Sequence, residues 1–550
     1  MATDQPINVA AHLPRMARAQ PDAPAVILQH GLDRYTQLSF KDLDVESNLL
    51  AAGLAQHDIG FGTRTVLMVK PSLEFFALTF ALLKAGAVPV LIDPGLGLVH
   101  LKRCIADAEP QAFIGISKAQ AARVILGWGS KSIRTRVTVG SRWFWGGTGY
   151  ATVKKAGLAA PQFKLPEVKP DDPAAILFTS GSTGPPKGAV YTHSIFAAQV
   201  EALRQLYDIT PGERDLATFP LFALFGPALG MTAIVPDMDA SRPARAKPER
   251  LVAAIQKWNA TNMFGSPALL DRLSRYGEMY ALKLPSLKRV LSAGAPVEPV
   301  ILERMQKLLA PGVEVFTPYG ATEALPVASI GSAEVLNDTR HATARGAGIC
   351  VGRVHGVDLR IIRIFDEPIA HWSDDLILPA GEVGEITVRG PVVTQSYFKR
   401  PEQTAASKIA DGSGRFWHRM GDVGSLDSQG RLWMCGRKSH RVQTRAGLLF
   451  SVPCEAIFNQ HAQVFRTALV GVGQALAQTP VLCVELVEGS RTKREQLTRE
   501  LLELGAQHAH TRAIRNVLFH SGFPVDIRHN AKISREKLSL WAAKRVRSEN

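Results

Sequence analysis

The sequence predicts an α/β protein in which helices cover largely parallel sheets, divided into two or more domains. Apolar runs typical of buried strands alternate with runs whose apolar residues recur at helical spacing. The chain has 550 residues, more than a single hydrophobic core supports. Its 46% hydrophobic and 21% charged residues are ordinary for a globular protein.

The first 140 residues carry this alternation most clearly. Residues 40–54 have apolar residues at helical spacing, and residues 65–69 and 88–92 have the composition of buried strands. Residues 75–92 are nearly all apolar, but a lysine, a glycine and a proline interrupt them. We therefore expect a buried helix followed by a strand here, and no transmembrane segment.

The alternation lapses from Ser141 to Asp172, which we interpret as an irregular connector. Its run Arg142–Trp145 holds three aromatic rings, interpreted as packing residues, with a docking patch for a partner or a lipid surface as the alternative. Alternation resumes from 194 to 315, and residues 384–390 are typical of a strand ending in a turn.

A second, smaller unit is expected to begin near Gly436 and Arg437. Strands are predicted at 467–472 and 481–487, with a polar helix at about 493–508.

Charge and cysteine usage narrow the functional classes. The net charge of +15 suits a polyanionic ligand, but no basic stripe with interleaved aromatic residues is present, so nucleic-acid binding is not expected. The five cysteines are scattered without a CxxC pair, which argues against a disulfide framework or a zinc site. The first ten residues lack the features of a signal peptide, and we expect a cytoplasmic protein.

The most informative segment is Thr179–Gly188, which follows the apolar run 174–178. Its glycines leave backbone N–H groups uncovered, and its hydroxyls and Lys187 supply further donors, so it is suited to wrapping an oligophosphate. It is not a Walker A loop, because Gly188 follows the lysine where a serine or threonine is required.

A second segment, Tyr319–Glu323, follows the apolar run 313–316. The tyrosine offers a flat face for a purine, Gly320 permits close backbone approach, and Glu323 has the oxygen ligands that Mg²⁺ prefers.

These segments resemble the adenylate-forming superfamily of acyl-CoA synthetases, firefly luciferase and peptide-synthetase adenylation domains. Further motifs follow in the family's order: Ser292–Pro296; Arg415–Val423, in which Met420 replaces a threonine; Gly436–Arg437; and Asn530–Ile533, in which Ala531 replaces a glycine. The resemblance implies a large N-terminal domain, residues 1–436, of two sheet–helix lobes and a small barrel-like part. It implies that residues 437–550 form a smaller, mobile α+β lid.

The resemblance also implies ATP and Mg²⁺ as cofactors and assigns roles to particular residues. Catalytic roles fall to Lys532, Glu323 and Thr322, and metal binding to Glu323 and Thr183. ATP binding is assigned to Thr179, Ser180, Gly181, Ser182, Thr183, Gly184, Lys187, Gly294, Ala295, Pro296, Thr317, Tyr319, Gly320, Thr322, Asp422 and Arg437. The substrate pocket is assigned to Phe222, Ala223 and Ala321.

Two departures from the family pattern indicate which product is made. The loop after Arg437 normally carries an acidic hinge, a lysine and a Gly-x-Arg stretch that serve the thiol of coenzyme A. Here Ser439–His440, Gln443 and Gly447–Leu449 stand in those places. Ala223 stands where relatives often carry a histidine or an aromatic residue, which either opens space beside the acyl carbonyl or is neutral packing.

These departures resemble the β-lactone synthetases of bacterial long-chain olefin biosynthesis. That resemblance implies a 2-alkyl-3-hydroxy fatty acid as substrate, whose own hydroxyl attacks the acyl-AMP. It implies a condensing thiolase, a reductase and a β-lactone decarboxylase as possible partners. A long-chain acyl-CoA ligase is the alternative, and a catalytically inactive scaffold is the alternative from another class.

Overall fold

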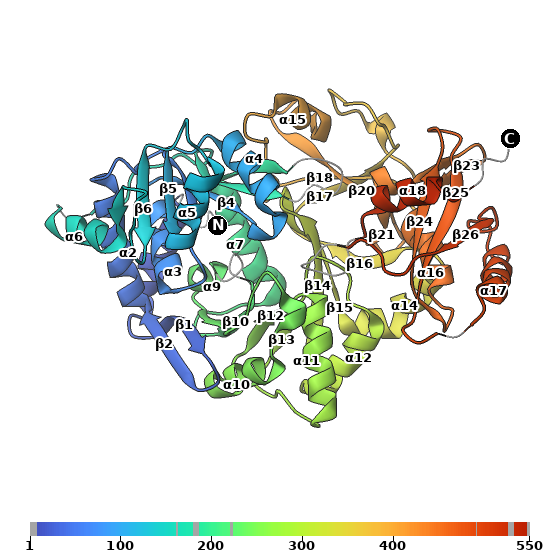
Figure 1. Ribbon diagram of the computed structural model, residues 1–550, viewed down its shortest axis with the longest axis horizontal. Coiled ribbons are helices and arrows are strands. Elements are labelled where there is room, and N and C mark those ends of the chain that lie inside the picture. The colour runs from blue at the N-terminus through green and yellow to red at the C-terminus, as the bar shows by residue number, and fades with distance from the viewer. Residues whose placement is uncertain are drawn as a thin grey trace.

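The computed structural model describes residues 8–160, 163–179, 186–219, 224–490, 492–525 and 533–546. Their strands form four sheets. Figure 1 shows the two large sheets side by side, with a smaller C-terminal unit beyond the second sheet.

The first sheet is nearly all parallel. In spatial order its described strands are β7 (Thr148–Gly149), β6 (Thr135–Val139), β5 (Ala112–Ile116), β3 (Arg64–Met68), β4 (Val88–Ile92), β8 (Pro173–Thr179) and β9 (Lys187–Thr192). Neighbours run parallel except β9, which pairs antiparallel with β8. The α/β prediction and the strands expected at 65–69, 88–92 and 174–178 are confirmed.

Helices flank this sheet and begin where local chemistry predicts. They are α2 (Phe40–Ala55), α3 (Leu73–Lys84), α4 (Leu98–Ala108), α5 (Ser117–Leu126) and α6 (Tyr150–Ala159). The Ser39 hydroxyl accepts a hydrogen bond from the Asp42 backbone N–H at 3.0 Å, and the Asp42 carboxylate accepts one from the Ser39 backbone, which closes a capping box at the start of α2. The Ser72 side chain caps the start of α3 by accepting a single backbone hydrogen bond.

The second sheet continues from a parallel part into an antiparallel part. Its parallel strands are β1 (Pro24–His30), β11 (Thr232–Val235), β10 (Arg214–Ala217), β12 (Asn262–Phe264), β13 (Arg289–Leu291) and β14 (Glu314–Ala321), with β2 (Arg34–Ser39) antiparallel at one edge. The antiparallel strands are β15 (Ala324–Gly331), β16 (Ile349–Val354), β21 (Arg431–Arg437), β20 (Phe416–Leu426), β18 (Gly384–Arg389) and β17 (Asp358–Ile362), and β19 (Lys408–Ala410) pairs with β20. The barrel-like part expected from the sequence corresponds to these antiparallel strands, which continue the second large sheet.

Most of the remaining helices of the N-terminal part accompany this second sheet, whereas η2 follows β4 of the first sheet and contacts α4. The longer ones are α1 (His12–Ala19), α7 (His193–Tyr207), α10 (Pro248–Trp258), α11 (Pro267–Met279) and α12 (Pro299–Leu308). The short ones are α9 (Phe225–Leu229), α13 (Ser332–Glu334), α14 (Arg340–Ala344) and α15 (Pro401–Ser407), with single turns η1 (Val9–Ala11), η2 (Pro94–Leu96), η3 (Pro243–Arg245), η4 (Val335–Thr339) and η5 (Asp374–Leu376).

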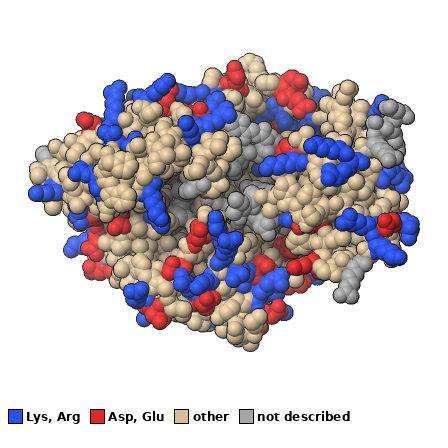
Figure 2. Space-filling view, in the orientation of Figure 1, with Lys and Arg blue, Asp and Glu red and all other residues tan. Residues whose placement is uncertain are grey.

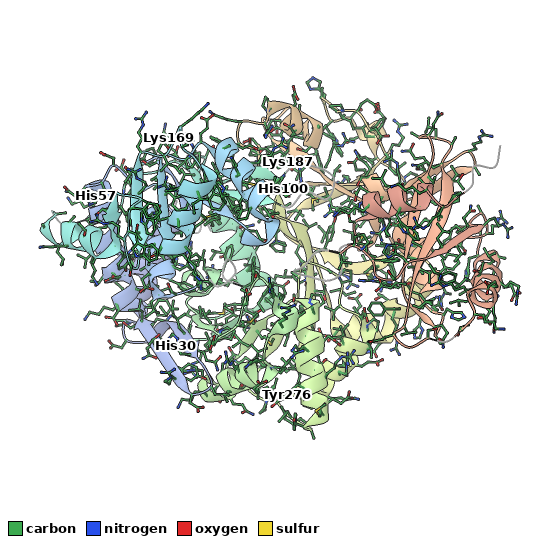
Figure 3. The ribbon with its side chains drawn as sticks, viewed as in Figure 1. His30, His57, His100, Lys169, Lys187 and Tyr276 are labelled. Carbon is green, nitrogen blue, oxygen red and sulfur yellow. The ribbon has the colours of Figure 1, made fainter. Side chains whose placement is uncertain are left out.

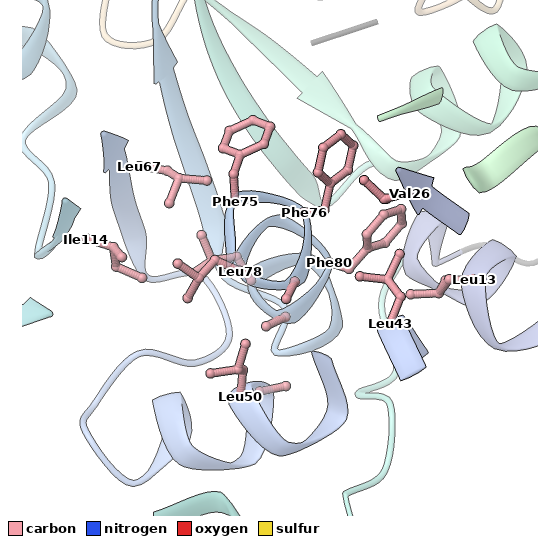
Figure 4. Packing of buried hydrophobic residues seen from close by; sticks show 14 of the residues in the cluster. Leu13, Val26, Leu43, Leu50, Leu67, Phe75, Phe76, Leu78, Phe80 and Ile114 are labelled. Carbon is pink, nitrogen blue, oxygen red and sulfur yellow. The ribbon is translucent and has the colours of Figure 1, made fainter. Parts of the chain in front are cut away.

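The two lobes share one hydrophobic core around α3 (Figure 4). Phe76 and Leu78 of α3 are fully buried, in a cluster with Val26 of β1 and Leu67 of β3. Full burial of such a side chain stabilises the fold by roughly 1.5–3 kcal/mol. The Lys84 ammonium at the end of α3 is also buried and donates to Asp44 Oδ1 at 2.6 Å. The apolar stretch 75–92 is therefore a helix and a strand, as expected.

The prediction of an irregular connector at 141–172 is wrong over part of its length. β7 and α6 lie within it, and α6 packs closely on α2. A Cβ added to Gly157 would lie 1.9 Å from the carbonyl oxygen of Leu49, so the glycine that weakens the helical sequence pattern is what permits the contact.

The C-terminal unit contains its own sheets and cores. Its elements are η6 (Lys438–His440), β22 (Val442–Thr444), β23 (Gly447–Leu449), α16 (Ser451–Phe458), β24 (Val464–Val472), β25 (Thr479–Leu486), α17 (Arg494–Ala506), β26 (Asn516–Phe519) and α18 (Arg535–Ala543). The predicted strands and polar helix are confirmed as β24, β25 and α17. In chain order β21 is the last strand of the large sheet, and it ends at Arg437. We therefore propose the domain boundary at residues 436 and 437.

Two smaller expectations concern cysteines and membrane spans. All five cysteines are buried and unpaired. None of the helices in the described ranges has the length and apolar character needed to cross a membrane.

Candidate active site

The strands on either side of the predicted phosphate loop are in place. β8 leads into the loop and β9 leads out, with Thr179 paired to Lys187 across the two strands. The Lys187 ammonium, labelled in Figure 3, lies 5.1 Å from the centre of the Tyr397 ring. The predicted site residues Ser180, Gly181, Ser182, Thr183, Gly184, Phe222, Ala223 and Lys532 lie outside the described residues, as does the side chain of Thr179.

The edge strand β9 connects the two large sheets. The backbone N–H of Phe398 donates to the carbonyl of Gly188 at 2.8 Å, and that of Val190 donates to the carbonyl of Ser396 at 3.1 Å. The same segment reaches the second sheet, where Val393 forms a bridge with Ala324 at the start of β15. Lys187 and the predicted metal ligand Glu323 are therefore held by one short stretch of chain.

Glu323 lies in the turn between β14 and β15 and is held from two directions. The Tyr397 hydroxyl donates to Glu323 Oε1 at 2.7 Å, and the backbone N–H of Thr394 donates to the Glu323 carbonyl at 2.8 Å. The hydroxyl of buried Tyr191 donates to the carbonyl of Thr322. These contacts fix the turn on which both predicted catalytic residues of the segment lie.

Gly320 allows this turn to close. A Cβ at position 320 would lie 2.6 Å from the carbonyl oxygen of Ala324 and 2.7 Å from the Leu325 side chain. No real Cβ tolerates such distances to backbone, so the glycine is required. Ala321 beside it packs against the hydrophobic core of the antiparallel strands.

Two buried basic groups behind the turn were missed by the sequence analysis. The Lys408 amine donates to the Thr394 carbonyl; burial lowers its pKa to about 7, while the charge of Glu323 opposes that shift. His418 is buried nearby, and burial together with the charges of Lys408 and Lys187 lowers its pKa well below the usual value. Lys408 lies in no recognised motif, and His418 lies at a position of the Arg415–Val423 motif to which no role was assigned; the topology of β18, β19 and β20 brings both to this place.

Asp422, Arg437 and Tyr319, which are predicted to bind the ribose and the purine, form a connected group. Asp422 on β20 and Arg437 on β21 are directly opposite each other in the ladder, and Arg437 Nε lies 3.1 Å from Asp422 Oδ1. The Tyr319 hydroxyl donates to Asp422 Oδ2 at 2.7 Å. Burial, and then the charge of Asp422, raise the pKa of Tyr319 well above its usual value, so it remains a neutral donor.

The predicted second wall of the nucleotide site follows β13. Gly294 has φ of +99°, a left-handed conformation that favours glycine, and Ala295 and Pro296 continue the loop toward the surface. The backbone N–H of Ser292 donates to the Phe316 carbonyl at 2.9 Å, so this loop starts beside Thr317 of β14. Both segments leave the carboxyl ends of neighbouring parallel strands.

An apolar pocket opens between α7, α9 and the strands β10, β12, β13 and β14. Its lining residues are Leu203, Tyr207, Ile209, Asp215, Phe225, Leu229, Met231, Asn262, Phe264, Leu291, Ala293, Pro318, Leu325 and Pro326. Ala293 and Pro318 place one wall of the pocket next to the predicted nucleotide site. The pocket can therefore hold an apolar group beside the predicted nucleotide site. In Figure 2 basic and acidic side chains are interspersed over this face of the molecule.

The segment Lys438–Arg441, which leads into the C-terminal unit, contacts both the N-terminal part and that unit. Lys438 Nζ lies 3.1 Å from Glu385 Oε1 of β18, and Arg441 forms two bonds of 2.7 and 2.6 Å to the Asp366 carboxylate. His440 Nε2 lies 3.2 Å from Glu536 Oε1 of α18, and burial lowers the pKa of His440 to about 4. The sequence thus departs from the family pattern in the same segment in which Lys438, His440 and Arg441 contact the rest of the chain.

Known proteins resemble this chain over most of its length. A family model described as AMP-binding enzyme matches residues 13–398. An olefin beta-lactone synthetase from Xanthomonas campestris pv. campestris is 52% identical over 548 residues, covering 98% of this chain and 97% of that protein. One from Stenotrophomonas maltophilia is 50% identical over 552 residues, covering 98% and 99%. A 4-chlorobenzoate–CoA ligase from Arthrobacter is 26% identical over 501 residues, covering 88% and 86%.

Solved structures support the fold. An amide bond synthetase from Marinactinospora thermotolerans has a TM-score of 0.78 at 23% identity, covering 97% of this chain and 99% of that one. ATP-bound MatB from Rhodopseudomonas palustris has a TM-score of 0.78 at 20% identity, covering 98% and 100%.

Proposed function

This chain belongs to the AMP-binding enzyme family, and on that premise we propose that it converts a 2-alkyl-3-hydroxy fatty acid and ATP into a β-lactone, AMP and pyrophosphate. The observation that carries the product is the identity of 52% and 50%, over nearly the whole chain, to two olefin beta-lactone synthetases. The 4-chlorobenzoate–CoA ligase is only 26% identical to this chain.

We propose that the nucleotide site for this reaction is formed by residues of β14, β20 and the loop after β13, together with the phosphate loop and Lys187. Asp422 would accept hydrogen bonds from the ribose hydroxyls, since a carboxylate's paired oxygens suit a pair of neighbouring donors. The ring of Tyr319 would stack on the purine, with Gly294–Pro296 as the opposite wall. Lys187 and the loop Thr179–Gly184 would hold the β- and γ-phosphates by charge and backbone donors.

Mg²⁺ fits the residues present. Within the described ranges no three histidine, cysteine, aspartate or glutamate side chains cluster into a metal site. Mg²⁺ is usually held by one or two carboxylates together with substrate phosphates, and Tyr397 orients the Glu323 carboxylate for such a role. We propose Glu323 and Thr183 as its protein ligands; the ion would neutralise phosphate charge.

The chemistry proceeds in two displacement steps. A carboxylate oxygen of the substrate attacks the α-phosphorus of ATP, and the bond to pyrophosphate breaks, giving acyl-AMP. The 3-hydroxyl oxygen then attacks the acyl carbon, its proton leaves, and the bond to AMP breaks as the four-membered ring closes. The attacking hydroxyl belongs to the same molecule as the acyl carbon, so no second substrate has to be bound. The entropy saved in this way offsets part of the strain of the four-membered ring.

The residues of this chain position and stabilise these steps. Lys532 would bridge the carboxylate and the α-phosphate, and Thr322 would bond a phosphate oxygen on the turn held by Tyr191 and Tyr397. The apolar pocket, with Phe222, Ala223 and Ala321 near it in sequence, would take the alkyl chains. The altered loop 439–449 is consistent with a reaction that needs no thiol.

A product assay tests the proposal. The enzyme is incubated with ATP, Mg²⁺ and a 2-alkyl-3-hydroxy acid, with and without coenzyme A, and the products are identified by mass spectrometry. We expect a β-lactone at equal rates in both reactions. A thioester that forms only with coenzyme A would establish the acyl-CoA ligase alternative, and the absence of ATP–pyrophosphate exchange would establish the inactive scaffold.

The same reaction implies its neighbours. A 2-alkyl-3-hydroxy acid requires a condensing thiolase and a reductase to supply it, and a β-lactone decarboxylase would consume the product to form an olefin. We propose that these enzymes act beside this one in the cytoplasm.

A further inference from the structure

The loop between β6 and β7 presents aromatic side chains to solvent. Trp143 is 65% exposed and Phe144 is 72% exposed, although large aromatic residues usually contribute to cores. Their ring centres lie 5.6 and 5.3 Å from that of Trp145. The interpretation as packing residues therefore holds for Trp145 alone, which is buried, and leaves the two outer rings unexplained.

The loop has a fixed shape that holds these rings outward. The indole N–H of Trp145 donates to the Thr138 hydroxyl at 3.0 Å, and the Arg142 guanidinium donates to the Gly147 carbonyl at 2.6 Å. Gly147 has φ of +77°, and a Cβ there would lie 2.5 Å from the carbonyl oxygen of Arg136. The exposure of the rings is thus built into a constrained turn.

The stretch of chain that contains the loop carries side-chain charges of one sign, although Glu46 of α2 pairs with Lys154 within it. Residues 110–166 contain nine lysines and arginines and no aspartate or glutamate, whereas the whole chain has 64 basic and 49 acidic residues. Six of the nine are exposed: Lys118, Lys131, Arg134, Arg142, Lys155 and Lys164. Lys118 is next to the loop, because the Ser117 hydroxyl donates to the Ser141 carbonyl at 2.6 Å.

We propose that this loop docks the enzyme onto an anionic phospholipid bilayer. Tryptophan and phenylalanine rings insert at the boundary of headgroups and acyl chains, and neighbouring basic residues are attracted by anionic lipid. A segment of 57 residues without one acidic side chain matches a uniformly negative surface, whereas protein partners usually present both signs.

The docking site lies at the same end of the sheet as the phosphate loop. β6 and β8 run in the same direction in one sheet, with β5, β3 and β4 between them, so their carboxyl ends are roughly 19 Å apart. Docking through the loop would hold that end of the sheet toward the membrane, where long-chain acids dissolve.

Vesicle sedimentation of the full-length enzyme tests the proposal. The vesicles contain phosphatidylcholine alone or with phosphatidylglycerol, at low and at high salt. The test variants are Trp143→Ala/Phe144→Ala and Lys118→Glu/Arg142→Glu. The control is Met279→Ala/Tyr280→Ala, an equally exposed apolar pair at the end of α11 in the other lobe.

We expect the unmodified enzyme to bind vesicles with phosphatidylglycerol, and high salt to weaken that binding. Each test variant is expected to lose roughly tenfold or more in partitioning, while the control is unchanged. All variants are expected to keep ATP–pyrophosphate exchange, which shows that they fold. The proposal is overturned if the unmodified enzyme does not bind, if the test variants bind equally well, or if the control loses as much.

Discussion

Replacing Asp422 with asparagine tests the nucleotide site at the residue that connects its parts. Asp422 contacts the Arg437 guanidinium at 3.1 Å and the Tyr319 hydroxyl at 2.7 Å, and is proposed to accept the ribose hydroxyls. Asparagine keeps the size and one acceptor oxygen but removes the charge, so Asp422→Asn changes electrostatics with little change in packing.

The expected loss follows from the contacts. Hydrogen bonds to a charged group contribute roughly 1.5–3 kcal/mol against about 1 kcal/mol for neutral pairs. Losing the charge from two ribose bonds therefore costs about 1–4 kcal/mol, or roughly five- to 800-fold in the dissociation constant for ATP. The free energy of unfolding is expected to fall by about 1 kcal/mol at most, because the Arg437 side chain is 38% exposed and the ion pair is screened by solvent.

The assay is isothermal titration of ATP together with thermal unfolding. Tyr319→Phe is the matched control, since it removes one donor to Asp422 and keeps both the carboxylate and the aromatic ring. We expect it to weaken ATP binding by less than tenfold. If Asp422→Asn binds ATP within threefold of the unmodified enzyme while its melting temperature is unchanged, the assignment of Asp422 to the ribose is refuted.

Three further predictions concern the catalytic turn, the lid and acid stability. Tyr397→Phe removes the 2.7 Å bond to Glu323 and is expected to raise the Mg²⁺ concentration needed for half-maximal exchange roughly tenfold; an unchanged Mg²⁺ titration contradicts this. Lys532→Ala is expected to slow adenylation more than roughly hundredfold while ATP still binds, and unchanged turnover would exclude its role. Burial lowers the pKa of His12 in the folded protein from 6.5 to about 4. As the pH falls below 6.5, the unfolded chain therefore binds a proton at this residue before the folded protein does. The free energy of unfolding is expected to decrease between pH 6.5 and pH 4 for this reason. The loss is about 3 kcal/mol, and His12→Gln is expected to flatten this dependence in urea titrations; an equally steep decline in the variant counts against it.

Much of the fold could be predicted because its signals are local. Alternating apolar runs identify β3, β4 and β8, and β8 leads into the glycine-rich loop as expected. Asp422 and Arg437 were placed at the nucleotide by resemblance, and the ladder of β20 and β21 sets them opposite each other.

Other parts could not be predicted because they depend on contacts between distant segments. Tyr397 supports Glu323 from 74 residues away, and Lys408 reaches the same place through the pairing of β19 with β20. Helix α6 was missed because Gly157 weakens the local signal, while its favourable contact with α2 is visible only in three dimensions.

Oxygen tracing tests the central claim, that the enzyme activates the carboxylate and the substrate's own hydroxyl closes the ring. The acid is prepared with ¹⁸O either in the carboxylate or in the 3-hydroxyl, and the β-lactone and AMP are analysed by mass spectrometry. We predict that carboxylate label divides between the lactone carbonyl and AMP, while hydroxyl label remains entirely in the lactone ring. Hydroxyl label appearing in AMP would show that the alcohol is activated instead and would contradict the account.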